Sequence, residues 1–150
     1  MNLLLREADS PADLDAVRAL LQQYWTSFGF TPCFQNFAQE LESLPGAYAR
    51  PGGCLLLASL DGDPAGCGAY RRVDDRRCEG KRLYVTPAAR GRQLGRILME
   101  RLISEARLAG YQELIGDTMP VMRTAIQLYQ DMGFAASEGE GGILLLRYRL

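Results

Sequence analysis

The spacing of apolar residues changes near residue 54, and this change limits the folds that the chain can adopt. Residues 14–28 place apolar side chains three and four positions apart, as in a helix with one buried face. Residues 54–60 instead form one continuous apolar run that is typical of a buried strand. The turn Asp61-Gly62-Asp63-Pro64 then separates this run from residues 65–72, its expected hairpin partner. The chain therefore combines helices with a sheet that contains hairpins.

The same signals predict the order strand, two helices, three strands, helix, strand, helix and two strands. The expected strands cover residues 2–7, 54–60, 65–72, 77–85, 111–118, 134–137 and 143–150, and the expected helices cover residues 11–28, 36–43, 92–109 and 121–132. Ser10-Pro11 has the pattern of an N-cap followed by the first helical residue. Hairpins early in the chain and one strand–helix–strand crossover indicate an α/β fold, a mixed sheet with helices on both faces. We expect residues 1–150 to form one domain.

Composition excludes several kinds of chemistry. Histidine is absent from the 150 residues, so we expect no metal site and no His-based catalysis. The four cysteines, Cys33, Cys54, Cys67 and Cys78, form no C-x-x-C pair and are expected to be buried, reduced thiols. No apolar run reaches the roughly 18 residues of a membrane helix, and the N-terminus lacks the pattern of a signal peptide. We therefore expect a cytoplasmic protein without a membrane partner.

Charge is unevenly distributed along the chain, although the net charge is only −1. Residues 1–63 contain eight acidic residues and three arginines, whereas residues 71–101 contain ten of the 17 basic residues. A basic middle segment can face a phosphate-rich ligand, and a solvated basic surface is the alternative. Nucleic acid is not an expected partner, because few aromatic residues are interleaved with these arginines and the chain as a whole is not basic.

A glycine-containing segment, Arg90-Gly91-Arg92-Gln93-Leu94-Gly95-Arg96, lies between an expected strand and an expected helix. The start of a helix presents unpaired backbone N–H groups and the positive end of the helix dipole, and glycines allow close approach of a ligand. These properties suit a pyrophosphate. The segment lacks the Gly-Lys-Ser/Thr of a Walker loop and the G-x-G-x-x-G of a dinucleotide-binding turn. A structural helix entry with surface arginines is the alternative interpretation.

Two segments together resemble the GNAT superfamily of acetyl-CoA-dependent N-acetyltransferases. Residues 90–95 resemble the family pattern Q/R-x-x-G-x-G/A and follow the strand-like Lys81-Arg82-Leu83-Tyr84-Val85. Residues 125–134, Ala-Ile-Gln-Leu-Tyr-Gln-Asp-Met-Gly-Phe, resemble the pattern A-x-x-L-Y-x-x-x-G-F. Gln93 stands where the first pattern has its first glycine, and Met122 stands where the family often has Asn.

The resemblance spans about residues 52–136 and implies both a fold and a co-substrate. The implied fold is a GNAT-like, mostly antiparallel central sheet of about seven strands with about four helices on both faces. The implied co-substrate is acetyl-CoA, with its pantetheine arm in a gap between the strands 77–85 and 111–118. The residues expected to bind it are Leu83, Tyr84, Val85, Arg90, Gly91, Arg92, Gln93, Leu94, Gly95 and Arg96.

Acetyl transfer to an amine needs a base that removes the amine proton and benefits from an acid that protonates the departing thiolate. By the same resemblance, Glu79 is the candidate base, and an ion pair with Lys81 or a neighbouring arginine is its alternative role. Tyr129 is the candidate acid, because its helical face should point inward. A core tyrosine with a satisfied hydroxyl is the alternative.

The aromatic residues near the N-terminus occupy the part of the chain where the family usually builds its acceptor pocket, and core packing is the alternative. They are Trp25, Phe28, Phe30, Phe34 and Phe37. With the acidic residues of 1–63, they favour a small or amino-acid-like amine that arrives protonated. A non-catalytic acetyl-CoA sensor of the same fold is the second functional hypothesis, and the sequence leaves homodimer formation open.

Overall fold

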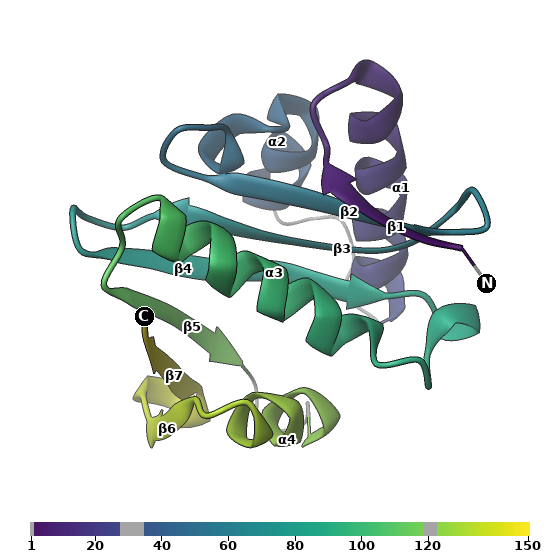
Figure 1. The fold of residues 1–150 in the computed structure, drawn as a ribbon. Coiled ribbons are helices and arrows are strands. Elements are labelled where there is room, and N and C mark those ends of the chain that lie inside the picture. The colour runs from purple at the N-terminus through teal and green to yellow at the C-terminus, as the bar shows by residue number, and fades with distance from the viewer. Residues whose placement is uncertain (1, 28–34, 119–122) are drawn as a thin grey trace.

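The computed structural model describes residues 2–27, 35–118 and 123–150, which form a seven-stranded sheet in the order β1-β2-β3-β4-β5-β7-β6 (Figure 1). The strands are β1 (Leu3–Glu7), β2 (Cys54–Leu60), β3 (Asp63–Arg72), β4 (Arg77–Val85), β5 (Glu113–Thr118), β6 (Ala135–Glu138) and β7 (Leu144–Arg149). The helices are α1 (Pro11–Ser27), α2 (Gln35–Ser43), α3 (Leu94–Leu108) and α4 (Arg123–Asp131), with short 3₁₀ turns η1 (Gly46–Tyr48), η2 (Pro87–Ala89) and η3 (Glu140–Gly142). Only β4 and β5 pair in parallel within this sheet of described residues. The expected mixed, mostly antiparallel sheet with four helices is therefore confirmed.

The order of elements and most of their bounds agree with the sequence-based predictions. The strands β2 and β4 begin and end at the expected residues, and the Asp13 N–H donates to Ser10 Oγ at 3.2 Å, as expected of an N-cap. The strand β5 begins at Glu113 rather than Tyr111. Tyr111 instead completes the end of α3, where its N–H donates to the Ala106 carbonyl at 3.1 Å. Residues 121 and 122 of the expected last helix lie outside the described residues.

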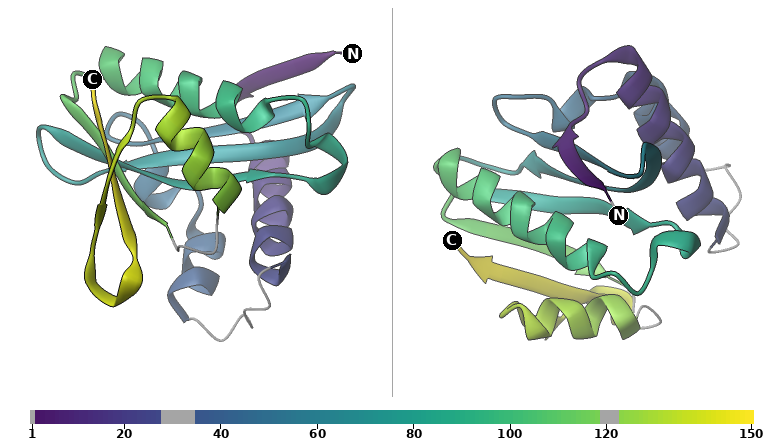
Figure 2. Two further views of the ribbon diagram at one scale, coloured as in Figure 1. Left: turned by 90° about the horizontal axis from the view of Figure 1, so that it is seen from below. Right: turned by 45° about the vertical axis from the view of Figure 1, so that its right-hand side comes forward.

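The four helices cover opposite faces of the sheet, and the continuous apolar run of β2 follows from this arrangement (Figure 2). We call the two sides the α1 face, covered by α1 and α2, and the α3 face, covered by α3 and α4. Leu55 and Leu57 pack on the α1 face, whereas Leu56 packs on the α3 face with Leu98 and Leu102. Because both faces of this strand are buried, it cannot alternate apolar with polar residues.

The sheet opens between β4 and β5, as the resemblance implies. These strands pair only at Arg77–Glu113, Cys78–Leu114 and Glu79–Ile115, whereas β5 keeps its pairing with β7 as far as Thr118. In the same stretch, the register between β3 and β4 shifts, and Arg82 adopts a left-handed conformation with φ of 61°. The irregularity is a β-bulge, which bends a strand away from its neighbour. It leaves residues 80–85 without a partner on the β5 side among the described strands.

Three of the four cysteines are buried free thiols, as expected. Burial raises the pKa of Cys54, Cys67 and Cys78 to about 12, so these side chains behave as small apolar groups. Cys33 lies outside the described residues. In the described ranges, no helix is long and apolar enough to cross a membrane, and no cluster of His, Cys, Asp or Glu could hold a metal ion.

We predict that Gly66→Ala lowers the free energy of unfolding by about 1–3 kcal/mol, because overpacking costs that much where backbone must move. An ideal Cβ at Gly66 would lie 2.8 Å from the Tyr84 carbonyl oxygen and 3.2 Å from Leu98 Cδ1. Urea denaturation measures the loss. Gly80→Ala is the control, because its Cβ would meet Leu114 Cδ1 at an ordinary 3.7 Å. Equal stability of the two variants would contradict the close approach of β3 and β4.

Candidate functional site

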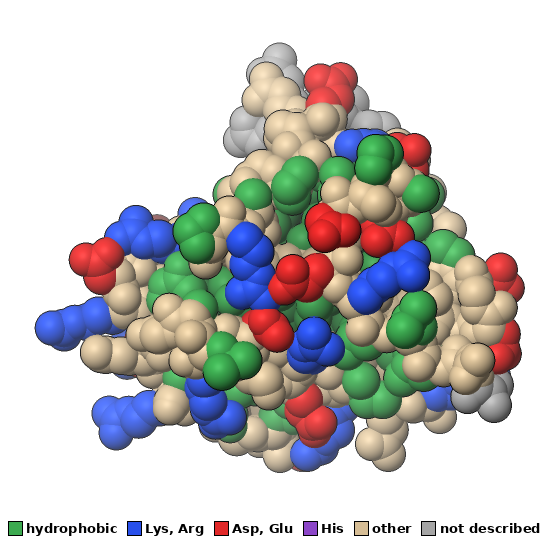
Figure 3. All heavy atoms as spheres, turned by 45° about the horizontal axis from the view of Figure 1, so that its top comes forward, with side chains coloured by type: hydrophobic (Ala, Val, Ile, Leu, Met, Phe, Trp, Pro, Cys, Tyr) green, Lys and Arg blue, Asp and Glu red, His purple; other side chains and the backbone are tan. Residues whose placement is uncertain are grey.

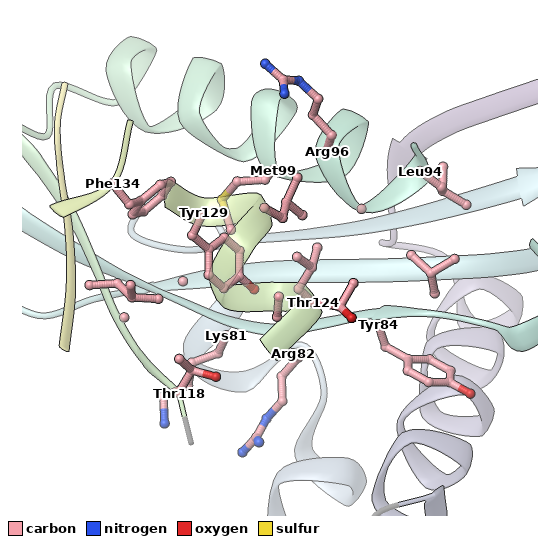
Figure 4. Close-up of a pocket in the computed structure, with 18 of the residues that line it drawn as sticks. Lys81, Arg82, Tyr84, Leu94, Arg96, Met99, Thr118, Thr124, Tyr129 and Phe134 are labelled. Carbon is pink, nitrogen blue, oxygen red and sulfur yellow. The ribbon is translucent and has the colours of Figure 1, made fainter. Parts of the chain in front are cut away.

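A cavity of about 760 Å³ occupies the gap between β4 and β5 (Figure 4). Its walls come from residues 80–85 of β4 and 114–118 of β5. On the α3 face it is bordered by the start of α3 and by α4, and on the α1 face it reaches Tyr24 and Ser27 of α1. The cavity therefore connects the two faces of the sheet through the gap between the strands.

The start of α3 forms one wall of this cavity and has the features that suit an anion. Gly91 and Gln93 turn the chain with φ of 82° and 58°, and the first helical backbone bond runs from the Ile97 N–H to the Gln93 carbonyl at 3.0 Å. The side chain of the N-cap residue Gln93 forms no cap hydrogen bond, which leaves the N–H groups of the first turn to a ligand. Six of the seven expected cradle residues line the cavity, namely Arg90, Gly91, Gln93, Leu94, Gly95 and Arg96. The seventh, Arg92, is exposed and is not among the lining residues.

Gln93 and Gly95 define the turn and the surroundings of this helix start. Gln93 occupies the left-handed conformation that a glycine adopts without strain, so the departure from the family pattern keeps the turn. A Cβ at Gly95 would lie 3.5 Å from Leu128 Cδ2 and 3.9 Å from Val85 Cγ2. Both distances are ordinary van der Waals contacts, so the helix start packs beside α4 and β4 with room for a methyl group at this position.

Tyr129 extends from α4 into the cavity, and its ring lies 5.5 Å from the Phe134 ring (Figure 4). Burial raises the pKa of the Tyr129 hydroxyl, and the charge of an ionised Tyr24 would add to the rise. The hydroxyl therefore stays protonated at neutral pH and is able to donate a proton or a hydrogen bond. Leu83, Tyr84 and Val85 also line the cavity, as the resemblance implies.

Glu79 lies at the end of the gap where β4 and β5 still pair, and not along the cavity walls. It forms the last pair with β5, opposite Ile115, and it is not among the residues that line the cavity. Its Oε1 accepts bonds from Arg71 Nε at 2.7 Å and from Arg71 Nη2 at 2.6 Å. The structure thus places Glu79 one residue from the cavity wall at Gly80, in an ion pair across β3 and β4.

Three charged residues for which the sequence predicted no role in binding or catalysis also line the cavity on the α1 face. They are Lys81 and Arg82 of β4 and Asp117 of β5. Arg82 donates from Nε and Nη2 to the two carboxylate oxygens of Glu40 at 2.7 and 3.0 Å. Lys81 and Arg82 belong to the strand segment that resembles the family. Their common orientation depends on the bulge, and no local sequence pattern predicts it. The sequence indicated the position of Asp117 only weakly. Asp117 alternates with the core-facing residues of β5, so its side chain points away from the core that they face.

The acidic residues of 1–63 do not line the cavity. Several of them pair with arginines, and acidic and basic side chains are interspersed on the face drawn in Figure 3. Among the aromatic residues, Trp25 stacks on Phe37 with ring centroids 4.3 Å apart, and Phe37 is buried in the core of the α1 face. Core packing is therefore the role that the structure shows for Phe37. Phe28, Phe30 and Phe34 lie outside the described residues.

Comparison with known proteins gives one family. The model of the acetyltransferase (GNAT) family matches residues 14–134. A Schizosaccharomyces pombe protein named as an uncharacterized N-acetyltransferase is 34% identical over 139 residues, which cover 91% of this chain and 85% of that protein. An Azospirillum brasilense protein named IAA acetyltransferase is 38% identical over 124 residues, 81% of this chain and 78% of its own. The Salmonella typhimurium protein yncA, solved with its cofactor acetyl-CoA, has a TM-score of 0.77 at 22% identity, and the match covers 100% of this chain and 95% of yncA.

We predict that Gln93→Gly raises the free energy of unfolding by about 1 kcal/mol, because glycine removes the cost of a left-handed residue. Gln93→Val should lower it, since a β-branched residue tolerates a positive φ poorly. Chemical denaturation of the two variants beside the parent protein measures both changes. A stabilising Gln93→Val substitution would show that the turn at residue 93 is not left-handed.

Proposed function

Because the chain belongs to the acetyltransferase (GNAT) family and is an acyltransferase, we propose that it moves an acetyl group from acetyl-CoA to the primary amine of a small molecule. The observation that carries the proposal is the cavity that joins the anion cradle at α3 to the α1 face through the gap in the sheet. The yncA structure, which holds acetyl-CoA, has the same fold and supports the choice of co-substrate. We assign the whole reaction to a single domain of residues 1–150.

The residues of the α3 face would hold the co-substrate, which supplies the acetyl thioester. The N–H groups of Leu94, Gly95 and Arg96 bind the pyrophosphate, assisted by the positive end of the α3 dipole. The pairing of β4 with β5 ends at Glu79, so the backbone groups of residues 83–85 on that side lack a strand partner. They pair with the amide groups of the pantetheine arm, as unpaired backbone groups in a cavity require.

Tyr129 acts as the acid in this proposal. Its hydroxyl lies in the cavity and is protonated at neutral pH, so a proton is available to the departing thiolate. The burial that raises the pKa also excludes water from the leaving group. Its contact with Phe134 holds the ring in position.

Glu79 acts as the base, through water that reaches it from the adjoining cavity wall at Gly80. Arg71 bonds Oε1 of this carboxylate, and no side chain of the described residues bonds Oε2, which can accept the amine proton. The ion pair with Arg71 also supports the alternative, in which Glu79 serves only to join β3 and β4. The two roles differ in how activity depends on pH.

The function is tested by mixing the protein with acetyl-CoA and a panel of amines, and by measuring thiol release. The panel holds amino acids, polyamines, aryl amines, aminoglycosides and basic peptides. Amine-dependent release is expected, together with a rise in melting temperature on addition of acetyl-CoA. Stabilisation by acetyl-CoA without release for any amine would favour the sensor hypothesis. Absence of both effects would refute the proposed function.

We predict that Tyr129→Phe lowers kcat about 10²–10⁴-fold, because the variant keeps the ring and loses the proton donor. The dissociation constant of acetyl-CoA should change little. Steady-state kinetics and a thermal shift titration measure the two quantities. Tyr24→Phe is the matched control, since it removes another tyrosine hydroxyl from the same cavity. If the chemical step limits turnover, an unchanged kcat for Tyr129→Phe would mean that Tyr129 is a core residue and not the acid.

We predict that Glu79→Gln lowers kcat/KM most at low pH and that the loss shrinks as pH rises. At low pH the amine is protonated and needs the base, whereas at high pH more of it is already neutral. A pH–rate profile from single-acceptor assays checks this. Arg71→Gln breaks the same ion pair but keeps the carboxylate, so its profile should follow the parent protein. A loss of equal size at every pH would mean that Glu79 positions the strands instead.

A further inference from the structure

The β-bulge turns two consecutive cations to the same side of β4. Neighbouring residues of a regular strand point to opposite faces. Lys81 pairs with Ala69, which packs in the core of the α1 face, and Arg82 bonds Glu40 of α2 on that same face. Figure 4 shows both side chains extending from β4 on the side away from α3. Leu83 then returns to the core of the α3 face.

Arg82 is held by Glu40, whereas Lys81 lacks a counter-ion among the residues that the structure describes. Glu40 engages two of the five N–H donors of the Arg82 guanidinium, which also lies 5.3 Å from the Phe37 ring centroid. Lys81 is half-buried, lines the cavity and forms no ion pair with any residue of the described ranges. A half-buried ammonium beside a fixed guanidinium is a binding site for an anion.

An acidic residue faces these cations across the gap. Asp117 lines the cavity from β5, and its strand neighbour Gly116 pairs with Leu146 in the core of the α3 face. The alternation of the strand therefore directs Asp117 to the α1 face, where its charge acts on Tyr24. Asp117 is exposed and forms no ion pair with the described part of the chain. It is suited to hold an ammonium group.

We infer that the acceptor carries a carboxylate beside its amine, as in an amino acid, with Lys81 and Arg82 binding the carboxylate and Asp117 binding the ammonium group. This inference rests on the proposed function and specifies its acceptor. It differs from the expectation of an acceptor drawn in by an acidic N-terminal half, because none of those acidic residues lines the cavity. A polycation would instead place positive charge against Lys81 and Arg82.

The test is calorimetric binding to the protein saturated with CoA, which requires no turnover. The probes are L-phenylalanine, L-methionine and L-aspartate, each compared with its α-carboxamide, at about pH 6.5, below the pKa of roughly 7.7–8.0 of an α-amino group. Each amide keeps the shape and the ammonium group but loses the carboxylate charge. At least one acid should bind about tenfold or more tightly than its amide, as a charge-assisted hydrogen bond predicts. Equal affinities throughout, or no binding of any acid, would overturn the inference.

Two variants identify the residue that provides this discrimination. Lys81→Met should weaken binding of the preferred acid about tenfold and leave its amide unchanged, whereas Arg76→Met removes an exposed charge outside the cavity and should change neither. Lys81→Glu should reverse the preference and favour 1,4-diaminobutane over the acid. Equal losses for acid and amide in Lys81→Met would overturn the inference. Retained CoA binding without preference for acids refutes this inference alone, whereas lack of CoA binding by the parent protein refutes the proposed function.

Discussion

The site depends on the point at which β4 and β5 stop pairing. Parallel pairing ends at Glu79–Ile115, and the bulge at Arg82 bends β4 away while β5 continues along β7. A sheet interior rarely leaves backbone groups without partners, because an unsatisfied buried group costs about as much as a lost hydrogen bond. A ligand that presents amide groups satisfies them. The gap is therefore both an opening through the sheet and a reason for an extended, amide-bearing arm to bind there.

The same bulge also sets the charge on the acceptor side. A regular β4 would direct Lys81 and Arg82 to opposite faces, with one of them in the apolar core beneath α3. The left-handed residue at Arg82 places both on the α1 face, and the pair with Glu40 ties α2 to the rim of the cavity. The bulge in β4 thus shapes the opening, anchors α2 and orients the cations that would bind an acceptor carboxylate.

Charge that is separated along the chain is not separated in space. Arg50 reaches both Glu7 of β1 and Glu105 of α3, and Arg82 reaches Glu40. These pairs join residues 42 to 55 positions apart in sequence. A count of acidic and basic residues in a segment therefore says little about the field inside the cavity, because neighbouring elements neutralise much of it.

Local patterns in the sequence determined the elements, because apolar periodicity and turn residues act over a few positions. They predicted the bounds of β2 and β4, a glycine-containing segment at the start of α3, and a Tyr129 that points inward. Only the tertiary structure decided the partner of Glu79, the common face of Lys81 and Arg82, and the place of Asp117 opposite them. These features follow from strand register and from a bulge, which depend on how β3, β4 and β5 pair. No short stretch of sequence encodes that pairing.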